Sequence, residues 1–464
     1  MSFASSDERE AAFALIAQRF GDRLSRALIV REQHANSVTW LSAEPPEAVF
    51  AAKTTDEVVE IVRICAAHRV PLIPFGTGTS VEGQVNAPMG GLCLSLRDMD
   101  AVLEINAEDF DATVEAGVTR EKLNAHLRDH GLFFPIDPGA DASLAGMAST
   151  RASGTNAVRY GTMRENVISL KVVLPDGSVS VTAKRARKSS AGYDMTHLFV
   201  GAEGTLGVIT EVTVKLHGIP ESVTGGYCAF PNVESACATV IETLQSGIPI
   251  ARVELLDASQ VAASNTYSKL ALPLAPHLFF EFHGTTASVE EQMRLFLALA
   301  GENGGHSFAW AASAEERNRL WKARHEAFWA AVATRPNSFG VSTDICVPLS
   351  RLAECVAETR ADMDQSGIPG TILGHVGDGN FHAIPLIDPR EPAEVERMEL
   401  FLDRLAARAH RVGGTCTGEH GIGQGRRRYM VAEFGAPLVA AMAGIKRALD
   451  PLGIMNPGKV LPEI

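Results

Sequence analysis

The chain has 464 residues, of which 46% are apolar, and its formal net charge at pH 7 is -13. This length allows two or three packed lobes, each with its own core. The negative charge argues against nucleic acid as a partner, because a phosphate backbone requires lysine and arginine gathered on one face. One basic run, Arg426-Arg427-Arg428, is expected to be a solvated surface.

Cysteine usage and hydropathy indicate where the protein works. Seven cysteines are scattered along the chain without a C-x-x-C pair, which argues against a disulfide framework or a thiolate zinc site. We expect reduced thiols in a cytoplasmic protein. Residues 1–26 mix acids, bases and apolar side chains, which excludes a signal peptide. No run approaches the roughly 18 apolar residues of a membrane span, so no integral membrane segment is expected, and any membrane association would be peripheral, at the inner membrane.

The first predicted lobe opens with a strand, a helix, a second strand and a glycine loop. Residues 48–52 predict the first strand, and the segment TTDE at 54–57 has capping-box spacing before a helix. A second strand at 71–75 runs directly into the loop at 76–80. This order is typical of a nucleotide-binding α/β lobe.

Glycine-rich loops recur at strand ends throughout this lobe, at 76–83, 137–140, 152–156 and 201–207. Backbone N–H groups in such loops can point at an anion because glycine has no Cβ. The first loop reads G-x-G-x-x-x-x-G and precedes a strand, so it fits neither a Rossmann fingerprint nor a Walker loop, and a nicotinamide cofactor is not expected. A single loop of this kind is as often a structural turn, but several in one lobe favour a long dinucleotide.

Several segments resemble the FAD-binding fold of the vanillyl-alcohol oxidase and p-cresol methylhydroxylase superfamily. They are PFGTGTS at 74–80, DPGADASLAGM at 137–147, ASGTNAVRYGTM at 152–163, GAEGTLGVIT at 201–210 and MNPGK at 455–459. Two more, GHVGDGNFH at 374–382 and TGEHGIG at 417–423, are similar to its branch of D-lactate dehydrogenases and glycolate oxidase subunits. Within that branch the mitochondrial type of D-lactate dehydrogenase is the most similar. The resemblance covers the chain from about residue 45 to its end.

The resemblance implies an α+β fold with a two-subdomain FAD-binding lobe and a cap domain built on an antiparallel sheet. Near residue 220 the pattern changes to longer helices alternating with strands, which places the main boundary there. We therefore expect four parts: an N-terminal helical segment at 1–44, the FAD-binding domain at 45–219, the substrate or cap domain with the metal site at 220–425, and a C-terminal helical segment at 426–464 that returns to the FAD lobe.

The resemblance also implies which residues hold FAD. Its diphosphate would lie on Gly76, Thr77, Gly78, Thr79 and Ser80, and Asn456 would close over the ring. The remaining implied contacts are Pro74, Gly83, Pro138, Gly139, Ser143, Gly146, Gly154, Thr155, Gly161, Glu203, Gly204, Gly207 and Ile209. Members that attach flavin covalently use His or Cys at set positions, and the loop at 74–83 contains neither, so non-covalent FAD is expected. For Arg151 the sequence suggests only a phosphate or ion-pair contact.

A pair of histidines flanks a predicted hairpin. Asp378-Gly379 is a strong two-residue turn signal between two apolar runs, and counting outward pairs His375 with His382, with Cβ atoms about 5 Å apart. Two imidazoles so placed can chelate a divalent ion, with Glu419 as the third ligand, although ordinary hydrogen-bonded core histidines would give the same pattern. The resemblance matches all three positions to the branch's metal ligands, and zinc or manganese would suit them.

His420 and Arg324 complete the predicted chemistry. His420 is the expected general base, because the unperturbed pKa of histidine, about 6.5, lies close to working pH. Arg324 matches the branch's clamp for the substrate carboxylate; a surface arginine on a basic helix is the alternative. The implied reaction binds a D-2-hydroxy acid to the metal through its carboxylate and hydroxyl. His420 takes the hydroxyl proton, and hydride passes from C2 to flavin N5.

Positions near this site bear on the substrate. Relatives that act on dicarboxylates carry further polar groups near Asp344 and after the second metal histidine, whereas this chain has Ser342, Phe328 and Ile384. These residues favour a small side chain, and D-lactate, over a second carboxylate.

Other readings of the sequence remain open. They are a glycolate oxidase flavin subunit, a D-2-hydroxyglutarate dehydrogenase, an alkylglycerone-phosphate synthase-like flavin transferase and a redox-silent FAD-binding subunit. The set His375, His382 and Glu419 argues against the transferase, and His420 argues against the silent subunit. A cytochrome, a quinone or an electron-transferring flavoprotein could accept the electrons, and a homodimer is compatible with the sequence.

Overall fold

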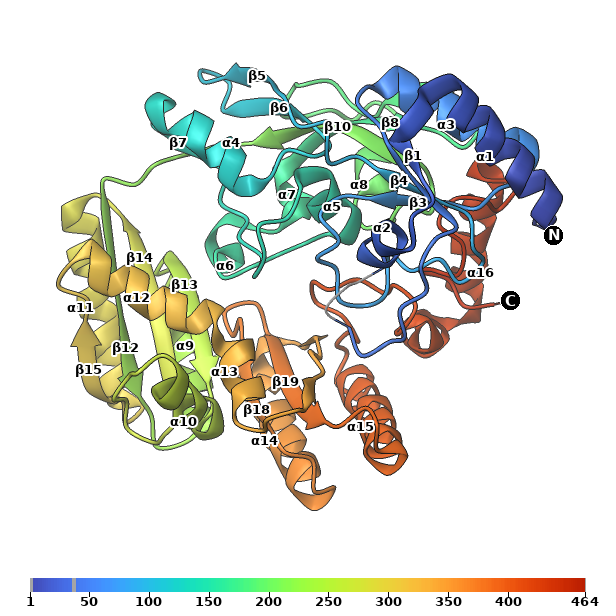
Figure 1. The fold of residues 1–464 in the computed structure, drawn as a ribbon. Coiled ribbons are helices and arrows are strands. Elements are labelled where there is room, and N and C mark those ends of the chain that lie inside the picture. Colours follow the sequence, from blue (N-terminus) through green and yellow to red (C-terminus); the bar gives the residue numbers. More distant parts are fainter. Residues whose placement is uncertain (1–2, 36–38, 464) are drawn as a thin grey trace. The chain divides into compact units, whose positions relative to one another are not determined.

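The computed structural model describes residues 3–35 and 39–463, and the chain divides into two compact units. Unit 1 comprises Met1–Ser153, Gly161–Ile219 and Glu419–Ile464; unit 2 comprises Gly154–Tyr160 and Pro220–Gly418. Each unit mixes helices with sheets (Figure 1), which confirms the predicted α+β class. The finer four-part division stays a prediction.

Unit 1 contains a small sheet with parallel strands at its centre. The strand order is β1-β2-β4-β3, formed by β1 Leu24–Ser25, β2 Ala48–Ala51, β4 Leu92–Ser95 and β3 Leu72–Phe75. β2, β4 and β3 are parallel, and α3 (Thr55–His68) connects β2 to β3. Thr54 caps α3 by accepting from the N–H of Glu57 (3.2 Å). The predicted order of strand, helix, strand and glycine loop is confirmed.

An antiparallel sheet forms the rest of the unit 1 framework, with strand order β5-β6-β10-β8-β9. These strands are β5 Val102–Asn106, β6 Asp111–Glu115, β10 Val208–Lys215, β8 Val167–Val173 and β9 Val179–Val181, and β7 (Leu132–Phe133) pairs with β11 (His217–Gly218). The helical segments of the unit are α1 Ser6–Phe20, η1 Gly21–Arg23, α2 Leu28–Gln33, α4 Arg120–Leu127, η2 Arg128–His130, α5 Leu144–Thr150, α7 Met163–Asn166, α8 Met195–Phe199, η3 Arg427–Tyr429 and α16 Met430–Leu449. One apolar core joins both sheets.

The C-terminal segment lies beside the glycine loop of unit 1. The N–H of Leu72 donates to Ile454 and the N–H of Asn456 donates to Leu72 (both 2.8 Å), so residues 454–456 pair with the start of β3. This pairing explains why a polar MNPGK segment ends the chain: it extends an edge of the sheet and carries Asn456 to the loop that follows β3.

Unit 2 is built on an antiparallel sheet with the order β15-β12-β14-β13-β18-β19-β16, and β17 also pairs with β19. Its strands are β12 Ser222–Ala229, β13 Ile250–Leu256, β14 His277–Gly284, β15 His306–Trp310, β16 Phe339–Gly340, β17 Ile345–Cys346, β18 Gly370–Gly374 and β19 Asn380–Ile387. The predicted antiparallel sheet is confirmed.

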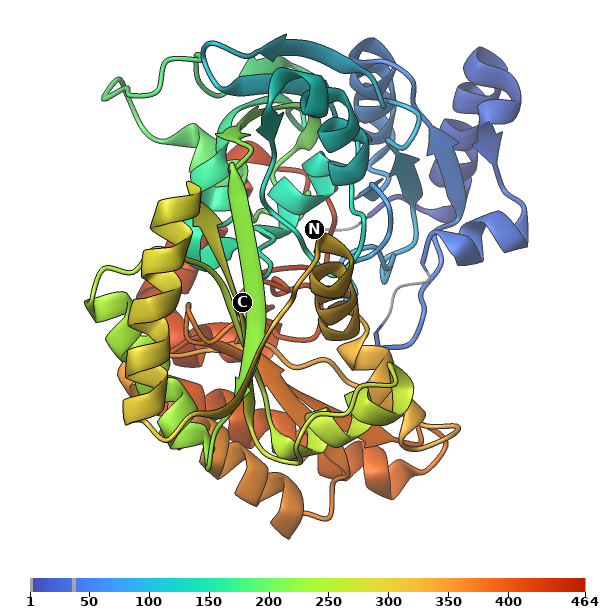
Figure 2. The same ribbon diagram turned by 90° about the vertical axis from the view of Figure 1, so that its left-hand side faces the viewer.

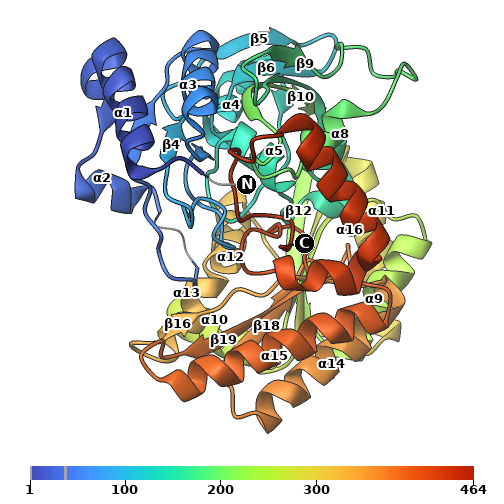
Figure 3. The same ribbon diagram turned by 90° about the vertical axis from the view of Figure 1, so that its right-hand side faces the viewer.

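Alternation along β14 divides this sheet into two different faces. Leu278, Phe280 and Phe282 point to one face and join its apolar core. That face is covered by α9 (Val233–Gln245), α11 (Thr286–Glu302), α14 (Leu349–Gln365) and α15 (Pro392–Arg411). Figure 2 shows the yellow helix α11 beside the long strand β12, and Figure 3 shows α14 and α15 along β18 and β19.

The opposite face carries charged residues as well as apolar ones. Glu281 on β14 and Arg252 and Glu254 on β13 point to it. The helices α10 (Ala258–Tyr267), α12 (Ala314–His325) and α13 (Ala327–Ala333) pack against this side, and α6 (Ala157–Tyr160) packs on β13. None of the helices in the described ranges has both the length and the apolar character needed to cross a bilayer.

Candidate functional site

Three of the predicted cofactor residues meet at the start of the glycine loop. A Cβ added at Gly76 would lie 2.3 Å from the Oγ of Ser143, and one added at Gly146 would lie 2.9 Å from the same atom. Ser143 precedes α5 and is buried, but its hydroxyl makes no capping bond. The loop after β3 and the start of α5 therefore approach as closely as glycine permits.

Buried polar atoms around this loop fit a bound dinucleotide. The Oγ atoms of Ser80 and Ser143 and the Oδ1 of Asn456 are buried and make no hydrogen bond within the part of the chain that the structure describes. The Nδ2 of Asn456, by contrast, donates to the carbonyls of Glu203 (2.7 Å) and Gln84 (3.1 Å). A buried polar atom without a partner is costly, and the phosphates and hydroxyls of FAD would supply partners to all three.

Most of the other predicted cofactor residues lie in unit 1, and two lie in unit 2. A Cβ on Gly204 would meet Pro74 at 3.0 Å, and the predicted glycines Gly78, Gly83, Gly161 and Gly207 likewise press against protein atoms, whereas Gly139 faces open space. Ile209 lies on β10 of unit 1. Gly154 and Thr155 belong to the short segment that is grouped with unit 2. As FAD contacts, all of these residues stay predictions.

Glu203 anchors the loop at 421–423 within unit 1. Its two carboxylate oxygens accept the N–H groups of Ile422 (2.7 Å) and Gly423 (2.8 Å), and the side chain is buried. Burial raises the pKa of the Glu203 carboxyl to about 7, although the two N–H groups and the nearby Lys459 oppose the rise. Below its pKa this carboxyl is neutral.

Replacement of Glu203 by glutamine should make thermal stability less sensitive to pH. A carboxyl whose folded pKa is raised from 4.5 to about 7 stabilises the fold fully below 4.5 and loses that contribution as pH rises through 7. Glutamine mimics the neutral carboxyl at every pH. The free energy of unfolding of Glu203→Gln, measured relative to wild type, should therefore rise by roughly 2 kcal/mol when the pH is raised from about 5 to about 7.5. Lys459, whose pKa burial lowers to about 8, stays mostly protonated across this window.

The measurement is the melting temperature of both FAD-loaded proteins at the two pH values. The variant should gain several degrees relative to wild type at the higher pH. A difference between variant and wild type that is the same at both pH values would contradict this assignment.

The basic run at 426–428 is not simply a solvated surface, contrary to prediction. Arg426 is buried, with its Nη2 2.6 Å from the Oε1 of Glu82, which is also buried. The Nε2 of Gln84 donates to the carbonyl of His420 (2.8 Å). The expectation was wrong because a buried carboxylate from a distant loop matches the arginine charge.

Arg151 has a structural contact: its Nη2 donates to the carbonyl of Val200 (3.1 Å).

The hairpin that carries the predicted metal ligands has a different register from the predicted one. Leu373, rather than His375, lies opposite His382. His375 begins the loop after β18, and the N–H groups of Asp378 (3.1 Å) and Asn380 (3.3 Å) both donate to its carbonyl. The prediction of a two-residue turn was wrong because these bonds close a longer loop. The two imidazoles nevertheless meet, with ring centroids 5.3 Å apart at 85°.

A buried carboxylate orients His375. The Oε1 of Glu254 lies 2.7 Å from the Nδ1 of His375, and its Oε2 lies 2.9 Å from the Nε and 2.6 Å from the Nη2 of Arg324. Glu254 is fully buried; burial alone would raise its pKa, but Arg324 and His375 hold it below the ordinary value. Because an ionised carboxylate only accepts, Nδ1 of His375 carries the proton and Nε2 is the ring atom with a lone pair.

His382 is held in the same tautomer by the backbone. Its Nδ1 lies 2.7 Å from the carbonyl oxygen of Thr343, which requires a proton on Nδ1 and again leaves the lone pair on Nε2. The next residue, Asp344, is buried and accepts from the Nδ2 of Asn380 and the Oγ1 of Thr417 (both 2.7 Å). Such outer hydrogen bonds are typical of metal-binding histidines.

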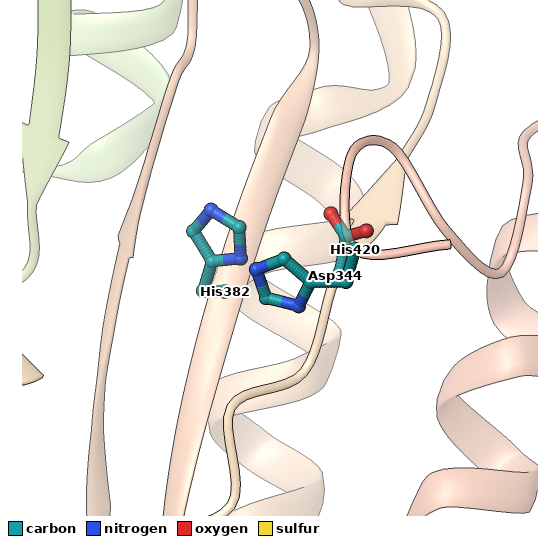
Figure 4. A group of neighbouring side chains, drawn as sticks. All are labelled: Asp344, His382 and His420. Carbon is teal, nitrogen blue, oxygen red and sulfur yellow. The ribbon is translucent and has the colours of Figure 1, made fainter. Parts of the chain in front are cut away.

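Within the described residues three groups of side chains could hold a metal: His410, Cys416 and Glu433 form one, and the other two overlap at His382. One ligand atom each from His375, His382 and Glu419 lies within 4.8 Å of the others, and the same holds for Asp344, His382 and His420. Figure 4 shows the second overlapping group, with the imidazoles of His382 and His420 next to each other and Asp344 beside them. Two imidazole nitrogens and a carboxylate are a donor set that suits zinc or manganese.

Chain connectivity keeps Glu419 and His420 near these histidines. Thr417 is bound to Asp344, and Glu419 and His420 follow it by only two and three residues. The Nε2 of His420 lies 3.8 Å from the Oε1 of Glu419. The predicted ligands and the predicted base therefore occupy one neighbourhood, while their roles stay a proposal.

Two residues of this site were missed by sequence reasoning, Glu254 and the Asp344 carboxylate. Glu254 lies within β13, in VELL at 253–256, and Asp344 directly precedes β17, in TDIC at 343–346; each is an acid beside apolar residues. A buried carboxylate must be paired, so these acids were a usable signal of a polar cluster, although the signal did not name the partner.

Comparison with known proteins identifies relatives over nearly the whole chain. Family models match residues 46–183 (FAD binding domain) and 219–460 (FAD linked oxidases, C-terminal domain). The chain is 52% identical over 435 residues to a protein of Danio rerio named "Probable D-lactate dehydrogenase, mitochondrial", with 93% of this chain and 88% of that protein covered. It is 46% identical over 420 residues to the mitochondrial "D-lactate dehydrogenase [cytochrome]" of Arabidopsis thaliana, with 90% and 74% covered.

A solved structure shares the fold. p-Cresol methylhydroxylase superposes with a TM-score of 0.83 at 18% identity, covering 98% of this chain and 97% of that one. The predicted vanillyl-alcohol oxidase type of fold is confirmed.

The predicted cytoplasmic location is wrong. Both relatives described above are named as mitochondrial proteins. Scattered reduced cysteines and the lack of a long apolar run fit the mitochondrial interior as well as the cytoplasm, so neither observation could distinguish the two compartments.

Proposed function

This chain belongs to the FAD-linked oxidase family, and from that premise we propose that it oxidises a small D-2-hydroxy acid, preferably D-lactate, to the 2-oxo acid. The observation that carries the proposal is the pair His375 and His382, each hydrogen-bonded at Nδ1 and gathered with Glu419. The carboxylate and hydroxyl of a 2-hydroxy acid are suited to chelate a divalent ion held by such a set. The names of both relatives support D-lactate as the substrate.

In the proposed mechanism the protein residues bind the substrate and move its proton. When bound, FAD supplies the hydride acceptor at N5 and the divalent ion, zinc or manganese, supplies positive charge that acidifies the substrate hydroxyl. His420 accepts the hydroxyl proton at a ring nitrogen. Arg324 binds the substrate carboxylate with a guanidinium that Glu254 already fixes on one side.

The acceptor of the electrons is proposed to be a cytochrome, rather than a quinone or an electron-transferring flavoprotein. The support is the name of the Arabidopsis thaliana relative, which specifies a cytochrome for that protein.

Side chains beside His382 support a small substrate. Ile384 lies two residues further along β19, so it shares the face of His382, and it packs with Phe328 of α13. An apolar pair at this position offers no partner to a second carboxylate, which would have to lose its water without compensation.

The substrate preference is tested by steady-state kinetics with an artificial electron acceptor. We expect kcat/KM for D-lactate to exceed that for D-2-hydroxyglutarate by about 10-fold or more, the effect of one uncompensated polar group. Equal or reversed specificity would contradict the proposal and favour a D-2-hydroxyglutarate dehydrogenase. Glycolate as the best substrate would favour the glycolate oxidase alternative.

A further inference from the structure

Helix α12 rests on two buried carboxylates of the unit 2 sheet. The indole N–H of Trp321 donates to the Oε2 of Glu281 (2.7 Å), and one turn later Arg324 binds Glu254. Glu254 is 0% exposed and Glu281 3% exposed. Both carboxylates therefore support helix α12.

The two carboxylates differ in what their other oxygen touches. The Oε1 of Glu281 lies 2.8 Å from the Nε2 of His283, its neighbour on β14. The Oε1 of Glu254 lies 2.7 Å from the Nδ1 of His375. Glu254 alone therefore touches both the proposed carboxylate clamp, Arg324, and a proposed metal ligand.

We propose that Glu254 is a positioning residue that couples binding of the substrate carboxylate at Arg324 to binding of the metal at His375. The inference rests on the proposed function and assigns a role to a residue outside the ligand set. Through Oε1 the carboxylate keeps the proton of His375 on Nδ1, presents Nε2 to the ion and increases its basicity. Through Oε2 it fixes the plane of the guanidinium. One buried carboxylate therefore supports both partners at once.

This arrangement also separates two consequences of losing a charge. Without Arg324, the Glu254 carboxylate still orients His375, so metal affinity should survive while substrate binding weakens. Without the Glu254 charge, both the ligand and the clamp lose their common support, so both affinities should fall.

The experiment compares Glu254→Gln with the matched control Glu281→Gln, both in the FAD-loaded protein. Metal-free protein is titrated with Mn²⁺, and KM and kcat for D-lactate are measured at saturating metal. Loss of a carboxylate behind a metal-binding histidine weakens metal binding by about 10–100-fold, so we expect that change in the Mn²⁺ Kd of Glu254→Gln together with a raised KM. Glu281→Gln should lower the melting temperature as much but keep the wild-type Kd. Arg324→Met should raise KM alone.

Each outcome decides between the proposals. A Glu254→Gln protein with the Mn²⁺ affinity of wild type would overturn the coupling. Should that variant not fold, the double variant Glu254→Gln/Arg324→Met removes both buried charges, and it must show the same loss of Mn²⁺ affinity. Failure of the wild type to bind Mn²⁺ or to oxidise D-lactate would instead contradict the proposed function.

Discussion

His420→Ala is expected to slow reduction of the bound flavin by D-lactate about 10²–10⁴-fold, the usual contribution of a general base. The side chain follows Glu419 directly, and its nitrogen belongs to the group with His382 and Asp344. Removal of the imidazole leaves the hydroxyl proton without an acceptor. The measurement is the rate of flavin bleaching after anaerobic mixing with D-lactate, with FAD and metal contents determined for the same samples.

The control for this variant is His126→Ala, which removes an exposed imidazole on α4 of unit 1. We expect wild-type bleaching from the control and partial recovery of His420→Ala on addition of free imidazole, which a structural defect would not show. A His420→Ala protein that bleaches at the wild-type rate would exclude this residue as the base.

His382→Ala should abolish metal binding and lower kcat/KM by about 10³-fold. The reason is that the charge of a bound ion contributes several kcal/mol to such a reaction. His382 belongs to both of the overlapping ligand groups, so its loss cannot be compensated by exchanging Glu419 for Asp344. The variant should lack zinc and manganese by elemental analysis. Its residual activity should not respond to a chelator, whereas wild-type activity should fall to the same level on chelation and return with added Mn²⁺.

The matched control is His306→Ala, which removes an exposed imidazole from β15, a different strand of the same sheet. This protein should keep its metal, its activity and its sensitivity to the chelator. Wild-type turnover that survives complete removal of divalent ions would contradict the metal-assisted mechanism, while leaving the FAD-binding fold unaffected.

The parts of the fold that were predictable are those fixed by local sequence. The strand, helix, strand and glycine-loop order at 48–80 follows from capping and turn signals and appears as β2, α3 and β3. The approach of Gly76 to Ser143 joins segments more than sixty residues apart, and only resemblance to a family pointed to it. The same resemblance implied that His375, His382 and Glu419 form one ligand set, and in the structure their ligand atoms lie close together.

What could not be predicted depends on tertiary contacts. The register of β18 and β19 differs from the expectation because the loop closes on the carbonyl of His375. Arg426 is buried because Glu82, far away in sequence, supplies its counter-charge. Periodicity does not reveal such pairings; the sequence shows only that a lone charge in an apolar context needs a partner somewhere.

The most direct test of the central claim is anaerobic mixing of the purified, FAD-loaded wild-type protein with D-lactate or L-lactate, with and without prior removal of divalent ions. We expect rapid bleaching of the flavin absorbance band by D-lactate only, and loss of that bleaching when the ions are removed. A flavin that stays oxidised with D-lactate, glycolate and longer D-2-hydroxy acids, although metal and FAD are both bound, would contradict the assignment of this chain as a D-2-hydroxy acid dehydrogenase.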